Sequence, residues 1–304
     1  HRDLHSFPTR RSSDLFSALF LAHPLGSQLA GFCIIGTVLP DLDIFLHPLS
    51  RREPRMYIFS HGGITHSIPG AFLLSITGFL VIALMQTAGF VSLPLEPEFW
   101  ILGLAVIAGG SLLHTGLDYL AYPGIPLFYP FSDRKFTLGV FPGPSLFLTG
   151  VSSIFLLFLI TGVSGIAGIF SWGTVFAAYV ALNLVKWGIA RYKFRNEKVI
   201  PTFNPLHWIL VREKGDTYVV CRYSVLRGIY ESMEYEKLRG MGEEELERFA
   251  DDPEMRRINY FSYFTVAEKN ADSIRVSDPL RISGIIQYPP HFSELSLKLT
   301  AMRD

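Results

Sequence analysis

Charge is scarce over most of this 304-residue chain. Residues 16–190 hold only 13 Asp, Glu, Lys or Arg side chains, and none lies between Lys135 and Lys186. Soluble domains carry about 25% charged residues, whereas this chain carries 18%, with a mean hydropathy of +0.30. The deficit indicates membrane-spanning helices. In contrast, residues 191–304 hold 36 of the 54 charged side chains, 18 of each sign, which predicts a soluble part.

Other absences narrow the class of protein further. The net charge is zero, so no basic surface points to nucleic acid as a partner. Only two cysteines are present, Cys33 in an apolar segment and Cys221 in the charged part. This argues against a disulfide framework or a zinc knuckle and fits a reduced, cytoplasm-facing chain. No His-Glu-x-x-His sequence of a zinc peptidase occurs, although lipase-like ester hydrolysis or peptide cleavage would use metal ligands similar to those described below.

The first residues lack a starting Met and the apolar core of a signal peptide. Residues 6–15, SFPTRRSSDL, resemble a translated sequencing adapter. We therefore interpret residues 1–15 as an artefact and leave them out of the fold prediction.

Apolar segments of about 20 residues are long enough to cross a bilayer as helices. A further segment, residues 16–39, contains His23, Pro24 and several glycines, which favours a re-entrant or packed helix over a free-standing span. The four segments predicted to span the membrane are residues 64–90, 99–119, 145–160 and 169–190.

Basic residues near span ends predict which side faces the cytoplasm. RYKFR at 191–195, RREPR at 51–55 and the pair Arg134 and Lys135 all fall on one side, while Glu96 and Glu98 fall on the other. We therefore predict an all-α multi-pass transmembrane helical bundle over residues 16–195. A small soluble α+β domain, residues 196–304, would follow it in the cytoplasm.

The predicted soluble domain contains alternating and helical patterns but no metal-ligand spacing. Residues 217–225, 272–288 and 292–300 read as strands. Residues 242–260 read as one helix, with acids in its first turn and arginines near its end. We interpret the domain as a regulatory, partner-binding or lid domain whose protein partner the sequence does not identify.

Polar residues gather at one end of the predicted spans. The topology places three short motifs at the same cytoplasmic level, where polar side chains are costly unless they have a function. His114 and Asp118 are four residues apart on a helix and therefore share a face. The motifs are LPDLD at 39–43, HGGITH at 61–66 and HTGLD at 114–118.

Imidazoles together with carboxylates are ligands of Zn²⁺, Mn²⁺ or Fe²⁺. His61 and His66 flank a Gly-Gly turn that lets both rings bend toward one point, and Asp41 and Asp43 follow Pro40, where a helix would end. More than four such groups can hold two ions, as in phosphoester hydrolysis. The alternative is a buried hydrogen-bond network that holds the helices together.

Nearby residues have two readings each. Arg134 and Lys135 can bind an anionic phosphate beside the metal, or anchor the chain at lipid headgroups. The hydroxyl groups of Thr65 and Ser67 could act as nucleophiles, but the sequence shows no partner for a catalytic triad. A helix-capping role is the favoured interpretation.

The sequence resembles the YdjM-like family of membrane-bound metal-dependent hydrolases. The resemblance rests on the three motifs at 39–43, 61–66 and 114–118, taken in order with His23, PFSDRKFTLG at 130–139 and NPLHWILV at 204–211. The resemblance covers residues 20–225. The family itself is distantly similar to zinc-dependent phospholipases C. One departure is Gly62, where the family pattern carries a basic residue. The resemblance implies a multi-pass inner membrane protein with His23, Asp41, His66, His114 and Asp118 as metal ligands.

The leading hypothesis is a metal-dependent hydrolase that activates water with one or two divalent ions, most simply zinc, at the cytoplasmic face. Asp43 would orient or deprotonate the water, and His61 would lie beside it as a second catalytic residue. The depth of the site favours a lipid or other phosphoester substrate. A transporter would need polar residues in the outer halves of the spans, and few occur there. A non-catalytic scaffold is the third hypothesis.

Overall fold

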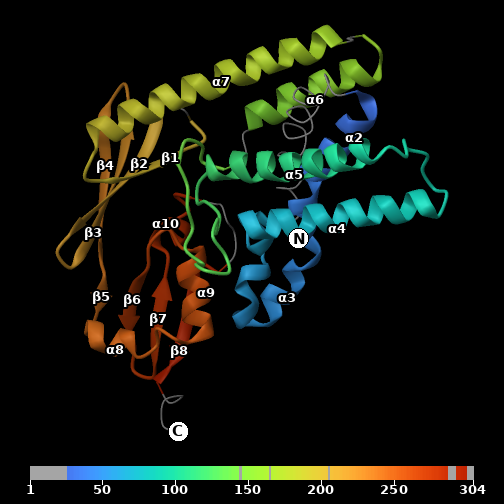
Figure 1. Ribbon diagram of the computed structural model, residues 1–304. Helices are drawn as coiled ribbons and strands as arrows, with labels where there is room; N and C mark the ends of the chain where they lie inside the picture. The colour runs from blue at the N-terminus through green and yellow to red at the C-terminus, as the bar shows by residue number, and fades with distance from the viewer. Residues whose placement is uncertain (1–25, 144–145, 164–165, 205, 287–291, 300–304) are drawn as a thin grey trace. The chain divides into compact units, whose positions relative to one another are not determined.

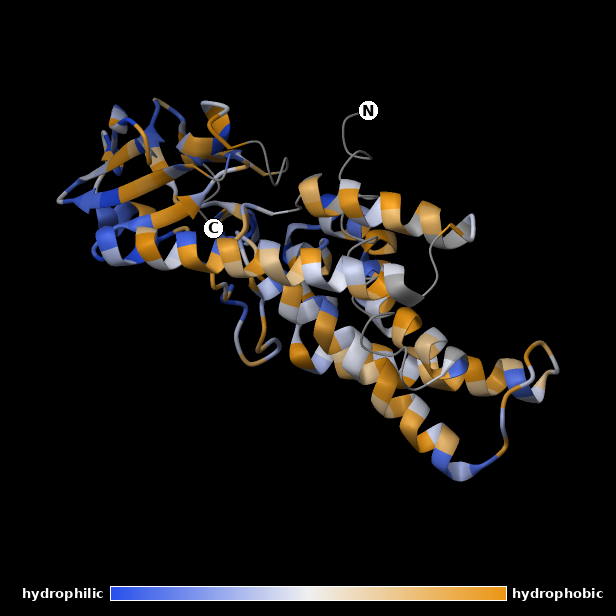
Figure 2. Cartoon of the chain, turned by 90° about the horizontal axis from the view of Figure 1, so that it is seen from above, coloured by the Kyte–Doolittle hydropathy of each residue, from blue (hydrophilic) through white to orange (hydrophobic). Residues whose placement is uncertain are grey.

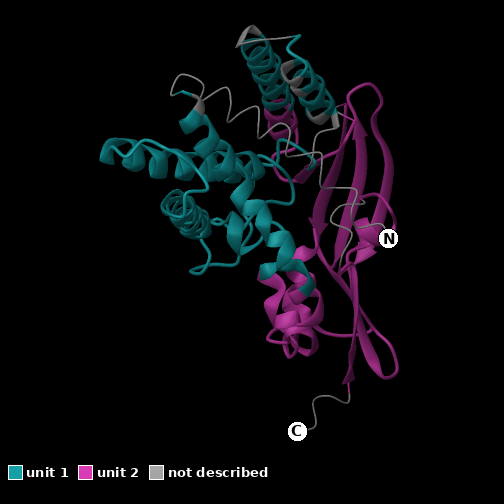
Figure 3. Ribbon diagram, turned by 90° about the vertical axis from the view of Figure 1, so that its right-hand side faces the viewer, with its two compact units in different colours: residues 1–48, 59–186 teal, residues 49–58, 187–304 magenta. Residues whose placement is uncertain are grey.

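The computed structural model describes residues 26–143, 146–163, 166–204, 206–286 and 292–299. The chain divides into two compact units, residues 1–48 with 59–186 and residues 49–58 with 187–304 (Figure 3). The predicted artefact, residues 1–15, and the predicted ligand His23 lie outside the described residues. The first unit is mainly helical, and every strand among the described residues lies in the second (Figure 1).

Helices form most of the first unit, and short 3₁₀ turns carry the site motifs between them. Trp172 and Ser152 join the last two helices, since the indole Nε1 donates to the Ser152 hydroxyl at 2.9 Å. The described helical elements up to residue 193 are, in chain order, α2 Ser27–Val38, η2 Leu39–Phe45, α3 His47–Arg52, η3 Pro54–Phe59, η4 Ile64–His66, α4 Ile68–Thr87, α5 Pro97–Tyr119, α6 Leu146–Ile160 and α7 Ile166–Lys193. Most of α3, nearly all of η3 and the end of α7 belong to the second unit.

Within the described residues, four helical stretches are long and apolar enough to cross a membrane: 28–52, 68–87, 97–119 and 168–193. This fits the predicted helical membrane part, but the set of spans differs. The stretch 28–52 is included and the predicted span 145–160 is not. The described part of α6 has 15 residues, which is about 22 Å of helix and short of a full span. The stretch 28–52 is not one α-helix, because η2 interrupts it.

Apolar side chains point outward from the long helices, which is the arrangement expected of a bundle in lipid. On α4, Leu73 and Leu84 are each 66% exposed, whereas Ser75 and Gly78 are buried. Figure 2 shows apolar colour along most of the long helices, with polar colour gathered on the strand-rich part. Small and hydroxyl residues on inner faces are typical of helix packing in membranes.

Helices α2 and α5 approach each other closely through glycines. A Cβ atom on Gly36 would lie 2.2 Å from the backbone oxygen of Ile107, and one on Gly110 would lie 2.4 Å from that of Cys33. Ser111 sits at the same crossing, where its hydroxyl donates to the Gly36 carbonyl at 2.9 Å and accepts from Ser75 at 3.0 Å. The crossing therefore fixes α2 against the half of α5 that leads to His114.

The second unit holds two four-stranded sheets, in agreement with the predicted α+β part. The first sheet is antiparallel in the order β1-β2-β3-β4, and the second has the order β5-β6-β7-β8 with one parallel pair, β5 and β6. The strands are β1 Lys198–Pro201, β2 His207–Lys214, β3 Thr217–Ser224, β4 Gly228–Glu236, β5 Leu238–Arg239, β6 Val266–Lys269, β7 Ser273–Ser277 and β8 Glu294–Lys298.

Two predictions for this unit were wrong in detail. Residues 242–260 form two helices, α8 Glu243–Glu247 and α9 Pro253–Phe261, because the Asp252 side chain caps a new helix that starts at Pro253. The strand predicted over residues 272–288 ends at Ser277, because Asp278 caps the short helix α10, Pro279–Ile282. Residues 283–286 are not strand, and residues 287–288 lie outside the described part of the chain. The strands predicted at 217–225 and 292–300 are confirmed as β3 and β8.

Candidate metal centre

One stripe of α5 leads directly to the site. Its buried residues recur every three or four positions, so they lie on one face of the helix. The first part of the stripe is small or aliphatic and packs against other helices, and the last turns carry His114 and Asp118. The buried residues are Gly103, Ile107, Gly110, Ser111, His114, Thr115 and Asp118.

The predicted motifs meet at this end of α5. Asp41 and Asp43 lie on η2 directly after α2, where Pro40 starts the tighter turn. His66 ends η4, and Ser67 then caps α4 by accepting from the Gly70 amide at 3.0 Å. The cap reading of Ser67 is therefore confirmed.

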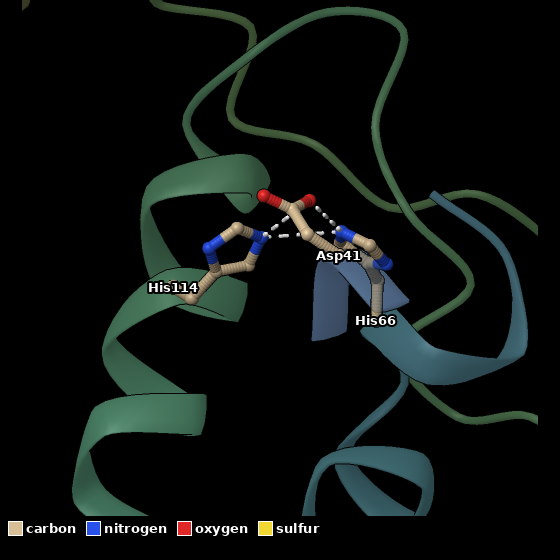
Figure 4. A group of neighbouring side chains, drawn as sticks. All are labelled: Asp41, His66 and His114. Carbon is tan, nitrogen blue, oxygen red and sulfur yellow. Dashed lines mark hydrogen bonds and ion pairs between the residues drawn. The ribbon is translucent and has the colours of Figure 1, made fainter. Parts of the chain in front are cut away.

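Three residues present ligand atoms to one point: Asp41, His66 and His114 (Figure 4). Nε2 of His66 lies 3.2 Å from Nε2 of His114, and Oδ1 of Asp41 lies 3.7 Å and 3.6 Å from these two nitrogens. All three side chains are at least 93% buried. Their atoms are close enough together to share one ion.

Asp118 adds a fourth ligand candidate. Its Oδ2 lies 3.3 Å from Nε2 of His66 and 3.8 Å from Nε2 of His114. In a tetrahedral zinc site, bonds of about 2.0–2.2 Å separate neighbouring ligand atoms by about 3.3–3.6 Å. The separations of 3.2–3.8 Å among these five pairs are close to that spacing, and Asp41, His66 and His114 form the set whose ligand atoms all lie within 4.8 Å of one another. The buried His and Asp residues can therefore hold a divalent metal ion.

Asp43 lies behind this set and supports it. Its Oδ2 accepts from the Thr65 hydroxyl at 2.8 Å and from the Gly62 amide at 3.0 Å, and lies 3.2 Å from Nδ1 of His66. Its Oδ1 lies 2.9 Å from Nδ1 of His61. A carboxylate in this position fixes the orientation of both rings. The sequence identified Asp43, but it did not show Thr65 or the Gly62 amide as its partners.

The departure at position 62 has a structural reason. Gly62 has a φ of +75°, and its amide donates to Asp43. A basic residue there would be strained, because side chains other than glycine disfavour positive φ. The backbone amide of Gly62 thus holds the Asp43 carboxylate, which in turn orients the rings of His61 and His66.

His61 is the most exposed member of the group, with 25% of its side chain accessible. Its ring stands edge-on to that of His66 at a centroid separation of 5.3 Å. Asp43, His61 and His66 also form a second group with converging ligand atoms. This group shares His66 with the first, and Asp43 already accepts from Thr65 and Gly62. The geometry therefore fits one ion better than two.

The loop after α5 is held against the same end of the helix. The Leu138 and Val140 amides donate to the carbonyls of Tyr119 and Leu120, each at 2.8 Å, and the Ile68 amide of α4 donates to Leu127 in the loop at 3.0 Å. This loop carries Arg134, which is exposed, and Lys135, which is half-buried. Neither belongs to the converging set, and their phosphate role stays a prediction.

A family model for the YdjM inner membrane protein matches residues 13–190, more than half of the chain. The chain belongs to the YdjM inner membrane protein family. The match confirms the resemblance to the YdjM family over residues 13–190 and, with the four candidate spans among the described residues, supports a membrane location for this YdjM protein. It does not reach the motif at 204–211, and the metal-dependent hydrolase activity stays a prediction. Comparison with curated proteins and with solved structures found no match.

Proposed function

We propose that this YdjM protein is a membrane-bound, metal-dependent hydrolase. The observation that carries the proposal is the spacing of the ligand atoms of Asp41, His66, His114 and Asp118 beside a second His-Asp pair, His61 and Asp43. A divalent ion held by the first four residues, most simply zinc, would supply Lewis acidity and lower the pKa of a water molecule.

The His61–Asp43 pair would handle the proton. Because Nδ1 of His61 lies 2.9 Å from the Asp43 carboxylate, the neutral ring would carry its hydrogen on Nδ1 and its acceptor lone pair on Nε2. Nε2 would accept the proton of the attacking water and later return it to the leaving group. Asp43 would stabilise the charged ring without touching the water. This assigns Asp43 a positioning role rather than the direct one expected from sequence.

A phosphoester is the proposed substrate class. Water adds to phosphorus, the bond from phosphorus to the ester oxygen breaks, and His61 transfers the proton. Arg134 and Lys135 would bind the phosphate charge, since guanidinium and ammonium groups favour phosphate oxygens. The motif at 61–66 ends just before α4, and the motif at 114–118 lies at the end of α5; both helices are candidate spans. A lipid phosphoester is therefore a natural substrate, with the C-terminal unit in the cytoplasm as the basic residues predict.

Replacing His61 with alanine should separate chemistry from metal binding. We expect turnover of a chromogenic phosphodiester to fall by about 10²–10⁴-fold, as for loss of a general base, while zinc content stays near that of the wild type. Zinc by mass spectrometry and hydrolysis in detergent would be measured on the same preparations. His207→Ala is the matched control, because His207 lies in β2 of the other unit. A His61→Ala variant with full activity would exclude this role.

Asp43→Asn tests the positioning role. The new side-chain amide can accept a hydrogen bond at its oxygen but not at its nitrogen, so the ring of either His61 or His66 loses its acceptor. We expect zinc affinity to fall about 10- to 100-fold, as for other residues that orient metal ligands. Competition with a chelating dye measures it, with Glu96→Gln before α5 as the control. Unchanged affinity would show that Asp43 does not support the ligands.

A further inference from the structure

Six large apolar side chains are exposed together at one end of the first sheet. Their exposed fractions run from 39% for Leu206 to 82% for Leu226. Single exposed apolar residues are ordinary on soluble surfaces, but a contiguous group marks a surface that binds something apolar. We call the group the apolar tip; it consists of Phe203, Leu206, Val225, Leu226, Ile229 and Tyr230.

The register of the sheet brings these residues together. The β1–β2 connection and the β3–β4 turn lie at the same end, because His207 pairs with Ser224 at the start of β2 and the end of β3. The Val225 amide donates to the Leu206 carbonyl at 3.0 Å. The ring of His207 lies 5.8 Å from that of Tyr230. The apolar tip is therefore one surface.

The last turns of α7 pack next to the tip within the same unit. Ala190 shares a core with Trp208 and Tyr223, which pair with each other on β2 and β3 two positions from the tip residues Leu206 and Val225. Lys193 Nζ donates to the Tyr223 hydroxyl at 2.9 Å and lies 4.7 Å from the centre of its ring. The apolar tip is thus attached to the end of a candidate span, residues 168–193.

That end of α7 has the composition of a membrane interface. Aromatic and basic side chains concentrate where a helix leaves the hydrocarbon. The guanidinium of Arg191 lies 6.0 Å from the Trp187 ring centre, and that of Arg195 lies 4.7 Å from the Tyr192 ring centre. Residues packed against this part of α7 lie close to the depth of lipid headgroups.

We propose that the apolar tip inserts into the boundary between headgroups and acyl chains of the bilayer that α7 crosses. Transfer of its apolar side chains out of water would be favourable. Arg227, exposed beside Leu226 in the β3–β4 turn, would contact lipid phosphate. The bilayer is favoured over a separate protein because α7 already holds the tip at the surface, so no independent encounter is needed.

Fluorescence at single cysteines tests this inference in the full chain. Leu226→Cys and, separately, Val225→Cys would be labelled with an environment-sensitive dye after Cys33→Ala and Cys221→Ser substitutions. The protein would be placed at one copy per nanodisc of phosphatidylethanolamine and phosphatidylglycerol. Asp216→Cys, in the turn between β2 and β3 at the other end of the sheet, is the control.

We expect both tip labels to emit at shorter wavelength than the control label. Lipids carrying a spin label near the headgroup should quench the tip labels about two-fold or more and the control little. A blue-shifted tip label that these lipids do not quench would mean that protein covers the tip, and an unshifted label would mean that water does. Either result would overturn the proposal.

Discussion

Zinc in the purified protein should fall from about one ion per chain to near zero when His66 or His114 is replaced with alanine, because a structural or catalytic site needs three or four protein ligands. The two imidazoles place their Nε2 atoms 3.2 Å apart and are at least 99% buried, so no other side chain can move in to replace them without repacking. Mass spectrometry on detergent-purified protein measures the content, after incubation with Zn²⁺, Mn²⁺ or Fe²⁺.

His207→Ala is the control for this experiment, since it removes an imidazole from the other unit. Circular dichroism and gel filtration would show that the variants still fold. A wild type that stays metal-free with all three ions would contradict the metal site and leave the buried hydrogen-bond network as its explanation. In that case His114→Ala should lower thermal stability without any change in metal content.

Gly110→Ala should destabilise the helical unit by about 1–3 kcal/mol or more, the usual cost of overpacking a tight contact. The new Cβ would meet the Cys33 carbonyl at 2.4 Å and the Thr37 amide at 3.0 Å, both on the backbone of α2. Backbone cannot move aside as a flexible side chain can, so α2 must shift. Since Asp41 follows α2 by three residues, zinc affinity should fall as well.

The neighbouring glycine gives a matched control. A Cβ on Gly109 would meet nothing within 4 Å. Alanine favours a helix interior over glycine by about 1 kcal/mol, so Gly109→Ala should be neutral or stabilising. Thermal unfolding in detergent and zinc affinity would be compared for the two variants. Equal stability of both would contradict a close α2–α5 contact.

The sequence predicted that the site motifs lie close together, because the spans are long and uncharged and the loops between them are short. His114 and Asp118 could be placed on one face from helical spacing alone. The pairing of Asp43 with Thr65 and the Gly62 amide could not, because it depends on the 3₁₀ turns of η2 and η4. Such turns change the direction of side chains within two or three residues.

The boundaries of elements were less predictable. The apolar pattern of residues 64–90 continues across His66 and Ser67, but α4 begins at Ile68, where Ser67 caps it. In the second unit the charge pattern of residues 242–260 suited one helix, and a single Asp-Pro step divided it. Local caps decided both cases, while periodicity reports only the face that an element buries.

The chain between Asp43 and His61 leaves the helical unit and returns to it. Residues 49–58 fold with the other unit, where the ring of Tyr57 lies 5.1 Å from that of Tyr260 on α9. Asp43 precedes this segment by six positions and His61 follows it by three. The candidate metal centre is therefore connected through the backbone, on both sides, to residues 49–58, which belong to the second unit. Movement of α9 that displaced Tyr57 would pull on both residues of the His61–Asp43 pair through the backbone.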